Sequence, residues 1–103
     1  MNGTNAACDV ALADGQLTVS GALSFDTVPD VLTRTAAWVA ASVKTVDLAR
    51  VQRADSAGLA LMVEWLRLAR KAGRNLQFIQ IPEQVREIIR VNGLSRAFDV
   101  NNS

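Results

Sequence analysis

The 103-residue sequence contains no histidine and no tyrosine, and it has a single cysteine, Cys8. Without histidine, the chain cannot build a Ser-His-Asp triad, a Cys-His nucleophile pair or a histidine-ligated metal site. Cys8 has no partner for an internal disulfide, as expected in a reducing compartment, and we interpret it as a buried structural thiol. We therefore expect a protein that is not an enzyme, and we predict no catalytic residue, cofactor or metal site.

Long hydrophobic runs and a strong net charge are also missing. No apolar stretch approaches the roughly 18 residues that a membrane span requires, and no basic segment followed by an apolar one suggests a signal peptide. A net charge of +1 provides no strong field for polyanions such as nucleic acids. We expect a cytoplasmic protein without direct membrane insertion and without nucleic-acid binding.

The length and the apolar content predict a folded chain. Half of the 103 residues are hydrophobic, which is enough for one domain with a modest core. We expect a single domain over residues 1–103. Its ends, residues 1–7 and 101–103, are expected to be frayed because they are small and polar.

Strand and helix patterns alternate along the chain. Asp14-Gly15 between two short alternating runs is typical of a β-hairpin. The later segments are predicted as a helix over 27–41 with Asp26 as its N-cap, a strand at 45–48, a loop over 49–54, a helix over 56–72, a strand at 76–81, a third helix after Pro82 and a short strand at 98–100. This order predicts an α/β fold with a mixed sheet and parallel crossovers.

The stretch Asp55-Ser56-Ala57-Gly58 begins the longest of these helices. Asp55 and Ser56 are both good N-cap residues, since their oxygens can accept from the unpaired N–H groups of a first helical turn. Behind them the helix carries two adjacent apolar stripes, and Leu61 and Trp65 belong to the second. One stripe is enough to cover a sheet. The second stripe is either covered by neighbouring helices or exposed as a docking surface for another protein.

Ser56 itself has three interpretations. It can be a plain N-cap, an exposed contact residue at the rim of the sheet, or a regulatory phosphorylation site whose phosphate is stabilised by the helix dipole and free N–H groups. A basic cluster at the far end of the same helix suits the negative end of the helix dipole, or contact with an acidic patch of a protein partner. Its members are Arg67, Arg70, Lys71 and Arg74.

The segments Val46-Asp47-Leu48 and Ala54-Asp55-Ser56-Ala57-Gly58-Leu59-Ala60-Leu61, with Val51 between them, resemble the signature of STAS domains, the sulphate transporter and anti-sigma factor antagonist family. The similarity extends from about Val10 to Phe98. It implies a STAS-like fold, with a four- to five-stranded mixed sheet, an N-terminal hairpin and three to four helices packed mainly on one face. It also implies that Ser56 matches the position phosphorylated in many sigma-regulatory members.

Within this family, the sequence is more similar to the Mla-type subunits. The resemblance lies in Leu59-Ala60-Leu61-Met62 continuing into Glu64-Trp65-Leu66 and in the Ile88-Ile89…Asn92-Gly93-Leu94 ending. Anti-sigma factor antagonists more often have a second serine where Ala57 stands and a glycine where Ala60 stands.

The resemblance implies a non-catalytic subunit, peripheral to the inner membrane through its complex. That subunit binds and regulates the ATPase of an ABC transporter for phospholipid trafficking and outer-membrane lipid asymmetry. The alternative is an anti-sigma factor antagonist that binds an anti-sigma factor kinase and is regulated by phosphorylation of Ser56.

We predict a set of partner-binding residues around the helix start. Asp55 and Ser56 would cap the helix and contact the ATPase, Gly58 would allow close backbone approach, and Leu61 and Trp65 would be buried at the interface. The full predicted set is Arg53, Asp55, Ser56, Ala57, Gly58, Leu61 and Trp65.

Overall fold

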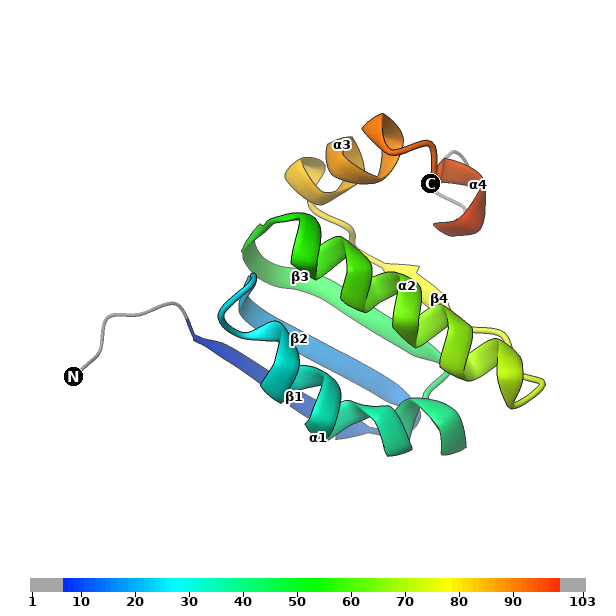
Figure 1. The fold of residues 1–103 in the computed structure, drawn as a ribbon. Coiled ribbons are helices and arrows are strands. Elements are labelled where there is room, and N and C mark those ends of the chain that lie inside the picture. The colour runs from blue at the N-terminus through cyan, green and yellow to red at the C-terminus, as the bar shows by residue number, and fades with distance from the viewer. Residues whose placement is uncertain (1–6, 99–103) are drawn as a thin grey trace.

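The computed structural model describes residues 7–98, which form one four-stranded sheet and four helices (Figure 1). In chain order the elements are β1 (Cys8–Ala13), β2 (Gln16–Leu23), α1 (Val28–Ala41), β3 (Thr45–Ala54), α2 (Ser56–Lys71), β4 (Gln77–Ile79), α3 (Glu83–Val91) and α4 (Ser95–Phe98). The strands lie in the order β1-β2-β3-β4, with β1 antiparallel to β2 and the other neighbours parallel. Helices α1 and α2 lie side by side over one face of the sheet. The predicted α/β fold with a mixed sheet and parallel crossovers is confirmed.

The N-terminal hairpin forms as the sequence predicts. Asp14 and Gly15 both have positive φ, 53° and 79°, as a two-residue hairpin turn of this type needs. The turn pairs Leu12 with Leu17 and Val10 with Val19, so the apolar side chains of both strands share the face that the helices cover. Period-two alternation then places the polar side chains on the opposite face of the sheet.

Strand β3 is longer than predicted. The expected loop over 49–54 is the second half of the strand, which continues to Ala54. Its pairing with β2 shifts register after Asp47 and again after Val51, and each shift inserts one extra residue into β3. A β-bulge breaks the two-residue alternation on which strand prediction depends. The buried residues of β3 therefore follow no simple period; they are Val46, Leu48, Val51 and Ala54.

The second apolar stripe of α2 is covered within the domain. Trp65 is fully buried, and its indole Nε1–H donates to the Thr35 hydroxyl of α1 at 2.8 Å. Thr35 in turn donates to the Val31 carbonyl at 2.8 Å, and the Trp65 ring stacks on Phe78 of β4 with centroids 6.3 Å apart. Helix α1 and strand β4 thus occupy the space that a partner would have needed beside Trp65.

Other details of the elements also differ from prediction. Thr27, not Asp26, occupies the N-cap position of α1. Strand β4 ends at Ile79 rather than at 81, because the chain turns at Gln80, whose φ is 55°. Phe98 belongs to the short helix α4 instead of a strand, where its ring meets Phe78 edge-to-face.

The ends of the chain fall partly outside the described residues. Residues 1–6 and 101–103, which were expected to be frayed, lie outside them, as do Asp99 and Val100 of the expected last strand. Ala7 accepts a backbone hydrogen bond from Ala22 at 2.9 Å. No helix between residues 7 and 98 combines the length and the apolar content that a membrane crossing requires.

Candidate protein-binding surface

The Asp55 carboxylate holds together two segments that are distant in sequence. One oxygen, Oδ1, accepts from the backbone N–H groups of Ala57 at 2.9 Å and Gly58 at 3.2 Å, which caps α2. The other oxygen, Oδ2, accepts from the backbone N–H of Phe25 at 3.1 Å, in the connection between β2 and α1. The Asp55 N–H also donates to the Leu23 carbonyl at 3.2 Å. The start of α2 and the β2–α1 connection are therefore one bonded unit.

These hydrogen bonds stabilise the ionised form of the Asp55 carboxylate. Desolvation by burial acts to raise the pKa of Asp55, but the hydrogen bonds from the N–H groups of Phe25, Gly58 and Ala57 outweigh it and lower the pKa below its ordinary value. Asp55, which is ionised at neutral pH even at its ordinary pKa, therefore stays ionised to a lower pH. Its negative charge lies at the positive end of the α2 dipole, where it is stabilised.

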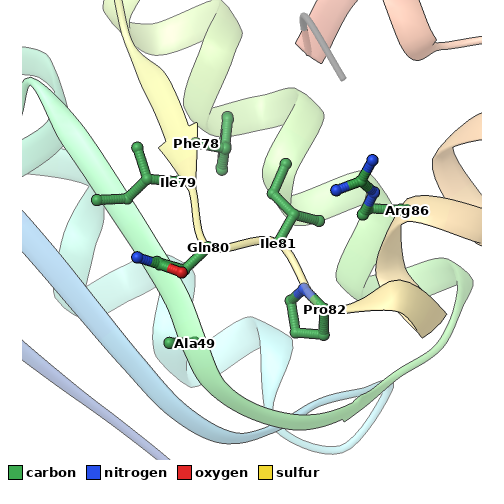
Figure 2. A pocket seen from close by; sticks show the side chains of 7 residues that line it. All are labelled: Ala49, Phe78, Ile79, Gln80, Ile81, Pro82 and Arg86. Atoms are coloured by element: carbon green, nitrogen blue, oxygen red, sulfur yellow. The ribbon is translucent and has the colours of Figure 1, made fainter. Parts of the chain in front are cut away.

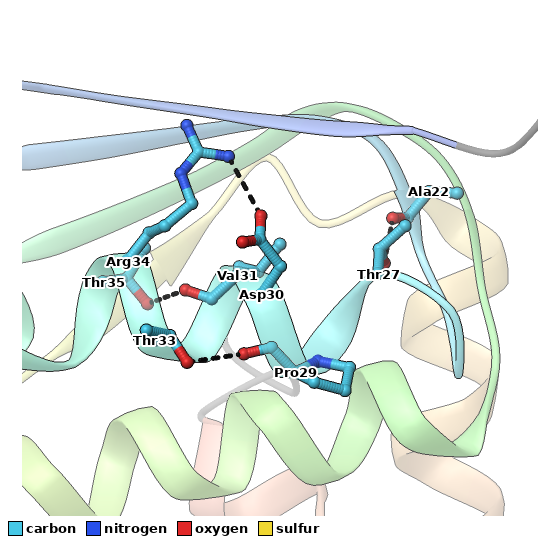
Figure 3. A network of polar contacts seen from close by, with 8 residues as sticks. All are labelled: Ala22, Thr27, Pro29, Asp30, Val31, Thr33, Arg34 and Thr35. Atoms are coloured by element: carbon cyan, nitrogen blue, oxygen red, sulfur yellow. Dashed lines mark hydrogen bonds and ion pairs between the residues drawn. The ribbon is translucent and has the colours of Figure 1, made fainter. Parts of the chain in front are cut away.

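Thr27 is a second residue that holds the β2–α1 connection in place, at the end next to α1 (Figure 3). The Thr27 hydroxyl donates to the Ala22 carbonyl at 2.7 Å and accepts from the Ser24 N–H at 3.0 Å. This use of the hydroxyl explains why Thr27 makes no side-chain capping bond to α1. With Thr27 at one end and Asp55 at the other, the backbone of Phe25 is fixed in place.

Phe25 is the exposed aromatic residue of this unit, with 78% of its surface accessible. Phe25 was not among the predicted contact residues. The available signal was an aromatic residue between Ser24 and Asp26 in a turn, where no apolar period explains it. On α2 the neighbouring exposed positions, Ser56, Ala60 and Val63, follow one another at helical spacing. We call the exposed residues Phe25, Arg53, Asp55, Ser56, Ala60 and Val63 the helix-start surface.

The predicted contact residues divide into exposed and buried groups. Arg53, Asp55 and Ser56 are exposed, and Ala57 is half-buried. Leu61, 2% exposed, and Trp65, 0% exposed, are core residues, so the prediction that they contact a partner directly is wrong. The reason is that α1 packs against the stripe of α2 that carries them.

Gly58 also has a different role from the one predicted. It is buried, and a Cβ at this position would lie 2.4 Å from the carbonyl oxygen of Leu23 and 2.9 Å from its Cβ. The close approach that Gly58 allows is between α2 and the chain's own β2. This packing brings the start of α2 against the β2–α1 connection.

The basic cluster at the end of α2 does not act as one patch. Arg67 pairs with Glu64 through a bond of 2.6 Å, and the Arg74 guanidinium donates to the carbonyls of Val39, in the last turn of α1, and Val43, just after α1. Arg70 and Lys71 are exposed. Half of the cluster thus has structural partners, which leaves little of it for recognising an acidic surface.

Few of the described side chains suggest nucleophilic or metal-binding chemistry. Burial, with a smaller contribution from Asp9, raises the pKa of the Cys8 thiol to about 11, so this half-buried residue is protonated and a poor nucleophile at neutral pH. Between residues 7 and 98 there is no cluster of three histidine, cysteine, aspartate or glutamate side chains that could hold a metal ion. The arrangement at the helix-start surface suits contact with a protein rather than bond-making chemistry.

Several solved structures have a fold similar to that of this chain. The chain is similar to an anti-sigma factor antagonist from Mycobacterium paratuberculosis, with 24% identity, a TM-score of 0.74, and coverage of 91% of this chain and 83% of that one. It is also similar to the anti-sigma factor antagonist SpoIIAA in its unphosphorylated form, with 16% identity, a TM-score of 0.69, and coverage of 86% and 83%.

A third similar structure is part of a larger protein. The murine anion transporter Slc26a9 matches with 19% identity and a TM-score of 0.65 over 88% of this chain, but over only 16% of the transporter chain. No curated protein matches the sequence. At these identities the similar structures establish the fold alone.

The family follows from the sequence match. A family model described as "Mlab, STAS domain" matches residues 7–100, which is nearly the whole chain. The match includes both segments of the helix-start surface and every element of the sheet. The chain therefore belongs to the Mlab-type STAS domain family.

Proposed function

We propose that the protein is a non-catalytic subunit that binds and regulates the ATPase of an Mla-type ABC transporter for phospholipid trafficking and outer-membrane lipid asymmetry. Membership of the Mlab-type STAS family supports this class of partner. In this role the protein lies in the cytoplasm and is peripheral to the inner membrane through its complex. It acts by binding the active arrangement of the ATPase more tightly than the inactive one.

The observation that carries the proposal is the exposed aromatic ring of Phe25 beside the Asp55-Ser56 helix start. Aromatic residues are enriched in the buried centres of protein interfaces, and an isolated, 78% exposed phenyl ring has no role in this domain's own core. Because Asp55 and Thr27 fix its backbone, Phe25 loses little conformational freedom on binding. In the proposed complex, Phe25 and Val63 provide the apolar contact, and Arg53, Asp55 and Ser56 form its polar rim.

The test begins with affinity purification of the tagged protein from its host in mild detergent, with mass spectrometry of the co-purifying chains. An ABC ATPase together with its membrane permease supports the proposal, whereas recovery of neither contradicts it. The affinity of the purified ATPase is then measured for Phe25→Ala and for Val91→Ala. Val91 is a matched control because it is apolar and 68% exposed but lies on α3.

We expect Phe25→Ala to weaken binding at least tenfold, or about 1.4 kcal/mol, and Val91→Ala to leave it unchanged. Ser56→Glu should also weaken the complex while the domain stays folded, because it adds a charge beside the ionised Asp55 carboxylate. Equal binding by wild type and Phe25→Ala would remove Phe25 from the interface.

The second candidate function is an anti-sigma factor antagonist, and one observation favours it. Ser56 is exposed, and its hydroxyl makes no hydrogen bond to any residue between 7 and 98, so a kinase can reach it. One of the similar structures is the Bacillus cell fate determinant SpoIIAA in a phosphorylated form. A phosphate on Ser56 would not find the N–H groups of Ala57 and Gly58 free, however, because the Asp55 carboxylate already accepts from them.

Incubation with ATP and the anti-sigma kinases of the host distinguishes the two functions. Phosphate on Ser56 of the wild-type chain, absent from Ser56→Ala, supports the antagonist. An unmodified Ser56 after incubation with every such kinase, together with recovery of the ATPase, supports the transporter subunit.

A further inference from the structure

The second half of strand β3 has a strand on one side only. Strand β4 pairs with β3 at residues 45–47, whereas β2 accompanies β3 along its whole length. Within residues 7–98, no strand pairs with the β4 side of β3 from 48 to 54. An unpaired strand edge of this kind presents backbone N–H and C=O groups to other chains, except that the Ala49 N–H here already donates to the Asp47 carboxylate at 2.9 Å.

A side chain of α3 closes the far end of this edge. The Gln84 amide oxygen accepts from the Ala54 N–H at 3.3 Å, and its amide nitrogen donates to the Ala54 carbonyl at 3.4 Å. The amide therefore bonds Ala54 as a neighbouring strand would. The open part of the edge runs from the end of β4 to Gln84, which leaves six residues, 48–53. Both bulges of β3 fall within this interval and shorten it, so an extended peptide of at most about six residues, roughly 20 Å long, fits beside it.

A hollow lies beside the open edge (Figure 2). It is open to solvent, has a volume of about 560 Å³, and includes Ala49 of β3 on one side. The segment after β4 forms the other side, because the positive φ of Gln80 turns the chain away from β3 toward α3. Five of its seven lining residues are apolar; the full lining is Ala49, Phe78, Ile79, Gln80, Ile81, Pro82 and Arg86.

Among its lining residues the hollow carries one charge, the Arg86 guanidinium, and the Asp47 carboxylate lies at its margin, where it accepts from the Ala49 N–H at 2.9 Å. Within the described part of the chain Arg86 makes no ion pair, whereas Arg34, Arg67 and Arg90 each pair with an acidic residue of their own helix. Arg50, exposed on the open half of β3, adds a second positive charge to this edge. Two arginines against the one carboxylate of Asp47 leave the site with an excess of positive charge, which is complementary to an acidic ligand.

We propose that this edge is a second binding site, which takes an extended acidic peptide segment of a partner protein. The peptide adds as a strand beside residues 48–53 of β3, and its main-chain groups pair with the free edge. One of its carboxylates binds Arg86, and an apolar side chain packs on Ile81 and Pro82. An open hollow of this shape would bury too little of a small molecule, which favours a peptide that also bonds the strand edge.

The test uses a phage-displayed dodecapeptide library selected on the wild-type chain. Enriched peptides are synthesised with a fluorescent label, and their affinity is measured by polarisation for wild type, Arg86→Ala and Arg96→Ala. Arg96 is an exposed arginine of α4 outside the hollow and serves as the matched control. We expect apolar peptides with an acidic residue, at least tenfold weaker binding to Arg86→Ala, and unchanged binding to Arg96→Ala.

Two further measurements examine the binding mode. In one, the peptide is N-methylated at alternate residues in two complementary series. Strand addition predicts that only one series loses binding, because successive N–H groups of a strand point to opposite sides. In the other, a peptide with lysine in place of its acidic residue should bind Arg86→Glu and not wild type. Binding of the lysine peptide would also show that the Arg86→Glu variant is folded.

The proposal is overturned if selection yields no binding peptide or if the peptides bind Arg86→Ala as well as wild type. Equal effects of both N-methylated series would exclude strand addition. None of these readouts involves Phe25 or Ser56, so the result is independent of the ATPase and kinase experiments.

Discussion

The bond between Trp65 and Thr35 leads to a quantitative prediction about stability. In Thr35→Val the side chain keeps its shape but loses the hydroxyl, so the buried Trp65 N–H loses its acceptor. A buried donor left without a partner costs about 1–3 kcal/mol. For a domain of this size, we expect the melting temperature to fall by about 4–8 °C per kcal/mol.

Thr33→Val is the control for this substitution. Both threonines lie on α1 and donate to the carbonyl four residues earlier, Thr33 to Pro29 at 3.0 Å and Thr35 to Val31 at 2.8 Å (Figure 3). They differ in that Thr33 is exposed and has no indole partner. Changes in helix propensity and in the local bond are therefore common to both variants. We expect Thr33→Val to change stability by no more than about 0.5 kcal/mol.

The assay is urea unfolding followed by circular dichroism, with the free energy of unfolding obtained by linear extrapolation. Trp65→Phe and the double variant Thr35→Val/Trp65→Phe complete a cycle that isolates the energy of the pair from the loss of ring volume. A coupling energy of about 0.5–3 kcal/mol is expected for residues in direct contact. If Thr35→Val were no more harmful than Thr33→Val, the indole would not depend on this hydroxyl, and our account of how α1 and α2 are matched would fail.

Three further substitutions follow from the same structure. Gly58→Ala should destabilise the fold by about 1–3 kcal/mol in urea unfolding, because its methyl group would clash with Leu23; wild-type stability would mean that the helix start shifts freely. The hydrogen bonds that lower the pKa of Asp55 stabilise the fold fully when the pH is above the ordinary carboxyl pKa of about 4. This stabilisation decreases as the pH falls below that value. Asp55→Asn should therefore flatten the loss of stability in acid, and an unchanged slope would contradict this. Arg74→Ala should cost about 1–3 kcal/mol through its lost carbonyl bonds, whereas the exposed Arg70→Ala should be nearly neutral; similar melting temperatures for both would refute it.

Elements whose structure depends on neighbouring residues were predictable from the sequence. The hairpin turn needs positive φ at Asp14 and Gly15, and the α2 cap needs an acceptor at Asp55 just before the apolar run. Both requirements can be recognised from a few adjacent residues of the sequence. The alternation of strands and helices then restricted the fold to few topologies.

What the sequence could not predict depends on contacts across the fold. The bulges of β3 follow from its pairing with β2, so the strand beyond residue 48 resembled a loop. Whether the second apolar stripe of α2 is covered or exposed depends on where α1 packs. In the structure α1 covers this stripe, so Trp65 lies in the core. The sequence shows that Phe25 lies in a turn, but its place beside the start of α2 depends on the bond from its N–H to Asp55, which is 30 residues away.

The division of roles in the β2–α1 connection has an evolutionary consequence. Thr27 and Asp55 maintain the shape of the connection through bonds to backbone groups, whereas the Phe25 side chain extends into solvent. Residue 25 is thus free to vary without a cost in folding, while substitution of either anchor would alter the backbone itself. If Phe25 contacts the partner as we propose, two copies of this domain can diverge after gene duplication in the partner they select by changing residue 25, on an otherwise identical scaffold.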